Sequence, residues 1–416
     1  MEDKKKVPRL RFPGFTDDWK QRKLGDLMDV GSVKRVHQTD WRDSGVRFLR
    51  ARDVVADFNN EEPDDYLYID QKMYEEYSAQ SGKVQQGDLL VTGVGTIGIP
   101  MLIKSEKPLY FKDGNIIWFK NKNAIDGQFF YYSFISKGIQ DFIKESAGIG
   151  TVGTYTIDSG KKTPINLPTS IEEQQEIGIY FKTLDNLITL HQRQLDNLKN
   201  LKKGCLQKMF PRYGETKPEL RFPGFTDDWE QRKVSEITKF HKQGFYTTED
   251  YNESKKYYLL RGTDLTENKL ILKDTPKIDA TEKDYQAFKT EVGDFLIVRS
   301  GTVGTYGIVY EDIPAIFGSY LIDFRFDMEQ VTNEFFGYFY QSESFKTQLR
   351  QIVQQSANTN INAENIKSTS IMLPSIDEQK RIGEYLGQID NLITLHQREL
   401  DELNQFKKGM LQQMFV

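Results

Sequence analysis

The chain has 416 residues, of which 38% are hydrophobic, 12% aromatic and 28% charged. This composition is typical of globular proteins and excludes a disordered or fibrous chain, and the length predicts two to four domains. The net charge of −5 weighs against nucleic acid as a partner, because DNA affinity comes largely from neutralising phosphates. The single cysteine, Cys205, excludes an internal disulfide and a cysteine-rich metal site.

The first residues are polar and lack the apolar stretch of a signal peptide. The most apolar run, residues 89–103, is interrupted by three glycines and a proline, so it does not predict a membrane span. Together with the single cysteine, which fits a reducing compartment, these features predict a cytoplasmic protein.

Two sequences are each written twice. Residues 10–19 read LRFPGFTDDW and recur unchanged at 220–229, an offset of 210, and residues 185–193 read DNLITLHQR and recur at 390–398, an offset of 205. These repeats bracket two halves of similar length. A period above 200 residues is too long for a solenoid, so the pattern predicts a tandem duplication with pseudo-twofold symmetry.

The two middle segments differ more, although they share a skeleton. The sequence GDLLV at 87–91 is answered by GDFLI at 293–297, and each is followed by a glycine-threonine turn. Short apolar runs rich in Val, Ile, Tyr and Phe, separated by turn residues, predict mixed strands with some helix. A group of six basic residues between Lys34 and Arg52 allows a basic face on an acidic chain, although a solvated surface of mixed charge is an equal alternative.

Each half ends in a long heptad pattern. Apolar residues recur at alternating intervals of four and three from Ile177 and again from Ile382, each after a proline and a serine that could cap a helix. We expect two helices of about 35 residues, or about 50 Å, packed as an antiparallel coiled coil, with an ordinary core helix as the alternative. The residues predicted to pair the helices are Leu184, Ile188, His191, Leu195, Leu198, Lys202, Ile389, Ile393, His396, Leu400, Leu403 and Lys407.

The polar positions of this seam predict its register. If they meet one another, residue numbers across the pair add to 598, which sets His191 against Lys407 and Lys202 against His396. The predicted fold class is α+β, and the chain divides into five parts. These are a repeated segment at 1–22, a first domain at 23–167, a central repeated region with a long helix at 168–232, a second domain at 233–373 and a final helix at 374–416.

The enzymatic motifs that we considered fail on their context. The pattern G-x-G-x-x-G occurs at 93–98 and 148–153, but neither copy precedes a predicted helix, so glycines that admit a close backbone or phosphate approach are the better interpretation. The nuclease-like outline at 63–72 has short spacing, and the sequence has neither a P-loop nor an adenine methyltransferase motif. The four histidines do not cluster. We therefore predict no catalytic residue and no metal ligand.

Two diverged domains between near-identical repeats, each repeat holding a long heptad helix, resemble the specificity subunits of type I restriction-modification systems. The resemblance covers almost the whole chain. It rests on residues 10–19 and their copy, on Leu-Pro followed by Glu-Gln at 167–174 and at 373–379, and on SANTNIN at 356–362. The chain lacks the short tetrapeptide repeats that some relatives carry in the central linker.

This resemblance implies that each middle segment is a target-recognition domain that reads one half of a bipartite, asymmetric site in double-stranded DNA. The helices would set the spacer and dock methyltransferase subunits, expected to be two, and restriction and translocase subunits would complete the complex. S-adenosylmethionine, ATP and Mg would bind to those partners and not to this chain. The alternative is a non-enzymatic bivalent scaffold with two ligand-binding domains, for which DNA would not be the ligand.

Reading DNA requires polar side chains at base edges, positioned by phosphate contacts. For each candidate residue, an exposed loop position without function is the alternative. The DNA-binding candidates are Lys34, Arg35, Arg50, Arg52, Thr96 and Lys112 in the first domain, and Arg261, Arg299, Ser300, Thr302, Asn358 and Asn360 in the second. The apolar residues of the first repeat, such as Phe12 and Trp19, are expected to dock on the domain cores or on partner subunits.

Overall fold

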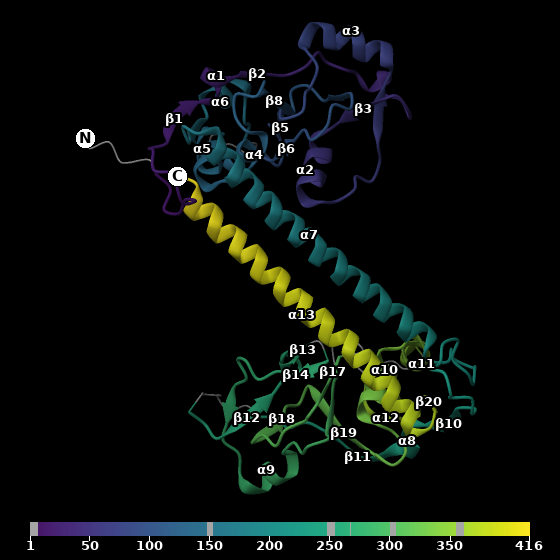
Figure 1. Ribbon diagram of the computed structural model, residues 1–416. Helices are drawn as coiled ribbons and strands as arrows, with labels where there is room; N and C mark the ends of the chain where they lie inside the picture. Colours follow the sequence, from purple (N-terminus) through teal and green to yellow (C-terminus); the bar gives the residue numbers. More distant parts are fainter. Residues whose placement is uncertain (1–6, 148–152, 248–253, 267, 300–304, 355–361) are drawn as a thin grey trace. The chain divides into compact units, whose positions relative to one another are not determined.

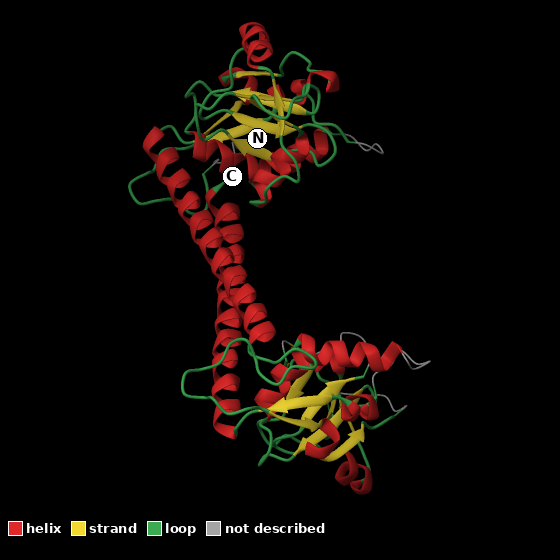
Figure 2. Ribbon diagram, turned by 90° about the vertical axis from the view of Figure 1, so that its right-hand side faces the viewer, coloured by secondary structure: helices red, strands yellow, loops and turns green. Residues whose placement is uncertain are grey.

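A computed structural model describes residues 7–147, 153–247, 254–266, 268–299, 305–354 and 362–416 (Figure 1). The chain forms two compact units, one of residues 1–193 with 397–416 and one of residues 194–396. Each unit holds a domain of mixed strands and helices together with parts of both long helices (Figure 2). Within the described residues, no helix is long and apolar enough to cross a membrane.

Unit 1 contains an antiparallel sheet of four strands in the order β2 (Asp29–Gly31), β8 (Ile116–Lys120), β5 (Leu89–Thr92), β6 (Pro100–Leu102). A second sheet has the order β4 (Leu67–Ile69), β3 (Val46–Leu49), β7 (Leu109–Phe111), in which β3 and β7 run parallel. The repeated segment adds β1 (Lys20–Lys23), which pairs with β9 (Pro164–Leu167). The shorter helices are α1 (Leu24–Leu27), α2 (Ala51–Asn59), α3 (Gln71–Ser81), α4 (Gly127–Ile135), α5 (Lys137–Ser146) and α6 (Ile157–Lys162), with a 3-10 turn at Gln38–Asp40.

Unit 2 repeats this plan. Its four-stranded sheet has the order β11 (Thr238–Gln243), β19 (Leu321–Phe326), β16 (Phe295–Val298), β17 (Tyr306–Ile308), and its three-stranded sheet has the order β15 (Lys277–Ile278), β12 (Tyr257–Leu260), β18 (Ala315–Phe317). Strand β10 (Glu230–Lys233) pairs with β20 (Ser370–Leu373), and β13 (Leu265–Thr266) pairs with β14 (Lys269–Leu270). The shorter helices are α8 (Val234–Ile237), α9 (Glu282–Phe288), α10 (Asn333–Gln341), α11 (Glu343–Gln354) and α12 (Ala363–Ser368), with a 3-10 turn at Gly262–Asp264. The predicted duplicated α+β fold is confirmed.

The larger core of each unit lies between its four-stranded sheet and the helices. In unit 1, Phe119 of β8 packs edge-to-face on Phe130 and Phe134 of α4. In unit 2, Phe295 of β16 packs edge-to-face on Phe336 of α10. The alternation of β16, in which Phe295 and Ile297 belong to this core while Leu296 belongs to another, explains why the strand is apolar on both faces.

The long helices are α7 (Ile171–Lys208) and α13 (Ile376–Met414), of 38 and 39 residues. The predicted serine caps are confirmed, because the Oγ atoms of Ser170 and Ser375 accept hydrogen bonds from the backbone N–H groups of Glu173 and Glu378. All twelve residues predicted to pair the helices are buried or half-buried. Their predicted role as a seam is consistent with this burial pattern.

The predicted register is wrong. In unit 1, Lys407 Nζ lies 2.5 Å from Asp185 Oδ1, and in unit 2, Lys202 Nζ lies 2.6 Å from Asp390 Oδ1. The residue numbers of both pairs add to 592 instead of 598. The prediction matched lysine with histidine because both interrupt the apolar pattern. A half-buried ammonium is better stabilised by a carboxylate, and each aspartate is the first residue of the DNLITLHQR repeat.

Candidate nucleic-acid interface

The two copies of the LRFPGFTDDW repeat, residues 10–19 and 220–229, which we call the leader repeats, share one ion pair with the long helices. The Arg11 guanidinium donates two hydrogen bonds of 2.7 Å to the Glu173 carboxylate, and Arg221 donates bonds of 2.8 and 2.7 Å to Glu378. Both carboxylates are buried, and the hydrogen bond that Arg11 donates to Glu173 raises the pKa of Arg11. Trp19 is buried in the larger core of unit 1, so docking of the leader repeat on its own domain is confirmed for this side chain.

The glutamines of the Glu-Gln motif join the same helices to the domains. In unit 1, Gln174 Oε1 accepts a hydrogen bond of 2.9 Å from the backbone N–H of Asp126, the residue that caps α4. In unit 2, Gln379 Oε1 accepts a bond of 3.0 Å from the N–H of Thr332, which caps α10. The Glu-Gln motif therefore links each long helix to the N-terminus of a helix in its domain.

A third repeated contact adds a tyrosine to each lysine-aspartate pair. Tyr132 of α4 donates a hydrogen bond of 2.6 Å to Asp185, and Tyr338 of α10 donates one of 2.9 Å to Asp390. Burial, followed by the charge of the neighbouring aspartate, raises the pKa of both phenols well above its usual value. Both tyrosines therefore stay protonated and act as donors. Sequence reasoning missed these residues, although the recurring aspartate was a visible signal.

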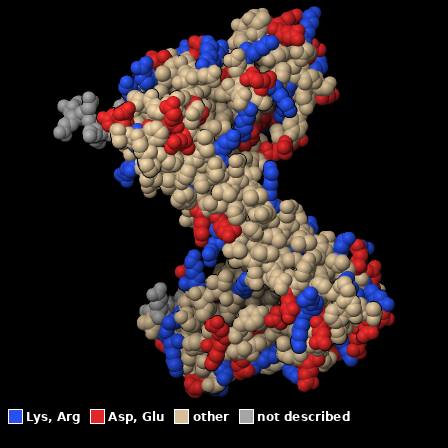
Figure 3. Space-filling view, viewed as in Figure 1, with Lys and Arg blue, Asp and Glu red and all other residues tan. Residues whose placement is uncertain are grey.

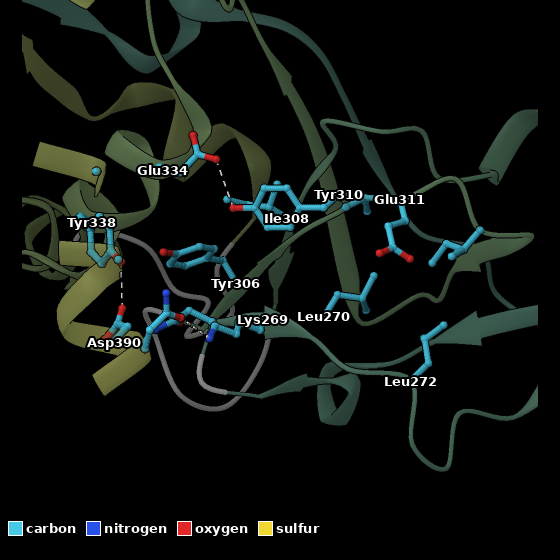
Figure 4. A pocket seen from close by; sticks show the side chains of 16 residues that line it. Lys269, Leu270, Leu272, Tyr306, Ile308, Tyr310, Glu311, Glu334, Tyr338 and Asp390 are labelled. Carbon is cyan, nitrogen blue, oxygen red and sulfur yellow. Dashed lines mark hydrogen bonds between the residues drawn. The ribbon is translucent and has the colours of Figure 1, made fainter. Parts of the chain in front are cut away.

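The tyrosine-aspartate contact of each unit borders a cavity. In unit 2 a cavity of about 540 Å³ lies between β14, β17, α10 and α13, and Figure 4 shows the Tyr338–Asp390 and Tyr310–Glu334 hydrogen bonds along its wall. The corresponding cavity in unit 1 has about 970 Å³ and is lined by Asp185 and Lys407 among others. The tyrosines, carboxylates and lysine named here bond to one another, so we expect them to stabilise the fold.

Most of the predicted DNA contacts of unit 1 gather around one turn. Strands β3 and β7 end side by side, and Arg50 follows the first while Lys112 follows the second and begins the turn to β8. Lys34 and Arg35 follow β2, and the Arg35 side chain bonds to Asp113 of the same turn at 2.8 Å. We call residues 112–115 the β7–β8 turn. Exposed Thr96 lies after β5, in the loop to β6, and no helix follows the glycines of this loop.

Two of the candidate arginines, Arg50 and Arg52, are already paired with aspartates. The Arg50 side chain, 14% exposed, bonds to Asp53 at 2.9 Å and to Asp65 at 3.0 Å, and Arg52 also pairs with Asp65. Burial lowers the pKa of Arg50, but the hydrogen bonds to both aspartates outweigh this effect and raise it. A guanidinium held in this way favours a structural role. Contact of Arg50 and Arg52 with DNA stays a prediction.

Unit 2 repeats this clamp. Arg261 Nε bonds to Asp264 at 3.2 Å, and the Asp264 carboxylate also accepts the backbone N–H of Arg261 at 2.7 Å. The Arg-x-x-Asp spacing was visible in both halves of the sequence, at Arg50 and Arg261, and the side-chain pair stabilises the turn after each strand. For Arg261, too, the structural role is the simpler one.

Three predicted cations lack a carboxylate partner among the described residues. Lys34 lies over the ring of Tyr77 and Lys112 over Trp41, at 4.1 and 5.8 Å from the ring centroids. Arg299, after β16 in unit 2, makes one long hydrogen bond of 3.5 Å to the carbonyl oxygen of Ser319. The remaining candidates of the second domain, Ser300, Thr302, Asn358 and Asn360, lie outside the described residues.

The face shown in Figure 3 does not carry a single basic patch. On the face shown in Figure 3, Lys and Arg side chains alternate with Asp and Glu over both units. Cations without a carboxylate partner, such as Lys34 and Arg299, are therefore the better candidates for contact with phosphates or bases.

Two similar α+β domains, each joined to long helices by repeated polar contacts, define a duplicated recognition protein. Residues 16–200 and 226–405 both match the type I restriction modification DNA specificity domain. The chain belongs to this family, the non-catalytic DNA specificity subunits of type I restriction-modification enzymes.

Relatives and solved structures are similar over long stretches. The chain is 26% identical over 310 residues to the type I restriction enzyme MjaVIII specificity subunit of Methanocaldococcus jannaschii, covering 70% of each chain. It is 22% identical over 196 residues to the EcoBI specificity subunit of Escherichia coli, covering 45% of this chain and 41% of that one. The S subunit from M. genitalium has the same fold, with a TM-score of 0.59, 14% identity and 99% of both chains covered.

A second structure shares the fold. A chain from a study of complex assembly and conformational transition in a type I restriction-modification system has a TM-score of 0.54 and 17% identity, covering 97% of this chain and 98% of that one.

Proposed function

We propose that the two domains read different halves of one bipartite, asymmetric DNA site. The observation that supports this most is a contrast within the chain. The Arg-Glu, Gln-backbone and Tyr-Asp-Lys contacts recur in both units, whereas the side chains at the exposed turns differ. A scaffold kept constant around two different surfaces is what recognition of two unlike half-sites requires.

We propose further that methyltransferase subunits dock on the repeated helical segments. In both copies of DNLITLHQR the two leucines that precede the histidine by four and one residues are exposed, although they are apolar: Leu187, Leu190, Leu392 and Leu395. Exposed apolar residues on a helix favour protein contact, and two copies favour two such subunits. Restriction and translocase subunits would join them in the cytoplasm, and S-adenosylmethionine, ATP and Mg would bind to the partners.

The decisive experiment is methylome sequencing of a host with and without this gene. We expect a bipartite methylated motif that disappears on deletion, and its absence in the wild-type strain would contradict the proposal. Binding of the assembled complex to DNA should weaken steeply with salt, because phosphate contacts release counterions. A bivalent protein scaffold need not show this dependence.

The helices are proposed to set the spacer between the half-sites. Inserting one heptad after Leu195 and another after His396 keeps the observed register, because these insertion points face each other when residue numbers add to 592. The insertion adds about 10 Å, or about three base pairs of duplex. We expect a motif with a spacer longer by about three base pairs or a loss of methylation. Unchanged methylation of the original motif would show that the helices do not set the spacing.

A further inference from the structure

One end of the four-stranded sheet of unit 2 carries an arginine and two exposed tyrosines. Arg299 lies directly opposite Tyr320, because β16 pairs with β19 up to Val298 and Leu321 and the Arg299 N–H then donates to the Tyr320 carbonyl at 2.9 Å. Residues opposite each other in an antiparallel pair project from the same face. Tyr246 lies near this end of the sheet, because the preceding residue, Phe245, forms a parallel β-bridge with Gly318.

The two tyrosine side chains are not packed into the fold, and the Arg299 side chain makes one long hydrogen bond, to the carbonyl oxygen of Ser319. Tyr246 and Tyr320 are 74% and 68% exposed, and neither side chain makes a hydrogen bond or an aromatic contact with the described residues. Arg299 has no carboxylate partner there, whereas Arg261 and Arg325 in the same unit are paired with Asp264 and Asp294. Exposed aromatic rings beside an unneutralised guanidinium are suited to bases and phosphates.

The same positions in unit 1 carry different chemistry. By strand register, Gly93 replaces Arg299 and Asn115 replaces Tyr320. A side chain cannot be accommodated at Gly93, because its Cβ would lie 2.7 Å from the carbonyl oxygen of Tyr155. The cations of unit 1 come instead from Lys34 and Arg35 after β2, the strand equivalent to β11. One backbone frame therefore presents two unlike sets of donors.

We propose that Arg299, Tyr320 and Tyr246 form the base-reading surface of unit 2 and set the base preference of its half-site. This inference rests on the proposed function. The Arg299 guanidinium donates to the O6 and N7 acceptors of a guanine, the pattern that arginine matches with two hydrogen bonds. The two tyrosine rings contact the neighbouring bases and exclude water from that pair.

The test is methylation of DNA by the assembled complex carrying R299A, R299K, Y320A or Y246A, on oligonucleotides with single-base changes in each half-site. We expect R299A to lose discrimination of about tenfold or more at one base pair of one half-site, with the other half-site unchanged. R299K keeps the charge but loses the paired geometry, so it should relax the same position. It is also the deciding variant if R299A does not assemble.

The control is Y213A, which removes a tyrosine that is 57% exposed on the segment after α7 in the same unit. We expect this variant to keep the wild-type motif. The inference is overturned if R299K retains full discrimination or if the Arg299 variants lose rate equally on every sequence, which would mark a phosphate contact only. If the wild-type complex methylates no bipartite motif, the proposed function itself fails.

Discussion

The contacts that join each domain to the long helices, which we call the joints, are the same in both units, whereas the residues at the turns differ. At the joints, Arg11–Glu173 and Arg221–Glu378 keep the same two-bond geometry, with distances that agree within 0.1 Å. At the turns, Gly93 in one unit stands where Arg299 stands in the other. The contrast shows that the ion pairs of the shared frame, whose carboxylates are buried, are kept in both units, while the side chain at the end of the sheet differs.

The largest effect should come from breaking a joint. Removing one partner of a buried ion pair leaves an uncompensated charge and costs about 3–5 kcal/mol. We expect E173A and E378A each to destabilise their own unit by this amount. E173A should cost slightly more, because Glu173 also accepts a hydrogen bond from Trp19 Nε1 at 3.3 Å while Trp229 Nε1 has no partner. Urea unfolding measures the loss of stability, and hydrogen exchange of the backbone amides shows which unit is destabilised.

For this comparison, the conservative variants R11K and R221K serve as controls. A lysine keeps the charge but makes a single contact in place of two, so a smaller loss is expected. Equal stability of E173A and wild type would show that the leader does not depend on this pair.

The fold class and the repeats followed from sequence because they depend on local pattern. Heptad spacing indicated α7 and α13, and the two serine caps were placed correctly. The register could not be obtained in this way, since Asp185 and Lys407 are separated by more than 200 residues and periodicity alone leaves several shifts of one helix along the other open. The predicted and observed registers differ in whether each lysine of the seam meets a histidine or an aspartate.

The candidate DNA contacts show a similar limit. The sequence named Lys34, Arg35 and Lys112 as candidates, and the positions of Arg35 and Lys112 after neighbouring strands explain why the structure brings these two to one turn. It could not show that Arg50 is already held by Asp65, which belongs to a loop 15 residues away. Whether an arginine is available depends on carboxylates supplied by the tertiary structure.

The second prediction concerns a buried position that differs between the units. Asp323 of β19 occupies the place of Trp118 in β8, and both of its carboxylate oxygens are buried without a hydrogen-bond partner. Burial, then repulsion by Asp294, raises its pKa to about 8. The folded state therefore keeps a proton that the unfolded state loses above about pH 4, so stability of unit 2 falls as pH rises from about 4 to about 8.

We expect D323N to remove much of this pH dependence and to stabilise unit 2 by about 1–3 kcal/mol near pH 8, because a neutral amide avoids the buried charge. Thermal unfolding across this pH range tests the point. Arg325 and Glu291 also face this group, so R325A is the informative second variant. It should raise the pKa of Asp323 further and extend the fall in stability to higher pH, because the slope from a single group cannot exceed one bound proton. If D323N leaves the slope unchanged, Asp323 is ionised in the folded protein.

A smaller effect is expected where a hydrogen bond is lost but the ion pair remains. Y132F removes the donor to Asp185, and Y338F removes the donor to Asp390, while Lys407 and Lys202 still neutralise the aspartates. We expect each to cost about 1–2 kcal/mol, equal within error. Denaturant midpoints of the two variants give the comparison. A much larger loss in one unit would show that its domain relies on this joint alone.

The smallest effect on stability should come from the Arg35–Asp113 pair at the β7–β8 turn, in which the arginine is exposed and the aspartate is half-buried. The Arg35 side chain is 69% exposed and pairs with Asp113, so D113N should change stability by less than about 1 kcal/mol. Its effect on DNA should be larger, because Arg35 then lacks a carboxylate partner, like Arg299 in unit 2. We expect tighter binding of the assembled complex and a steeper salt dependence. Competition binding at two salt concentrations measures both. If D113N binds no better than wild type at low salt, Arg35 does not face the DNA and the similarity between the two turns does not extend to their role.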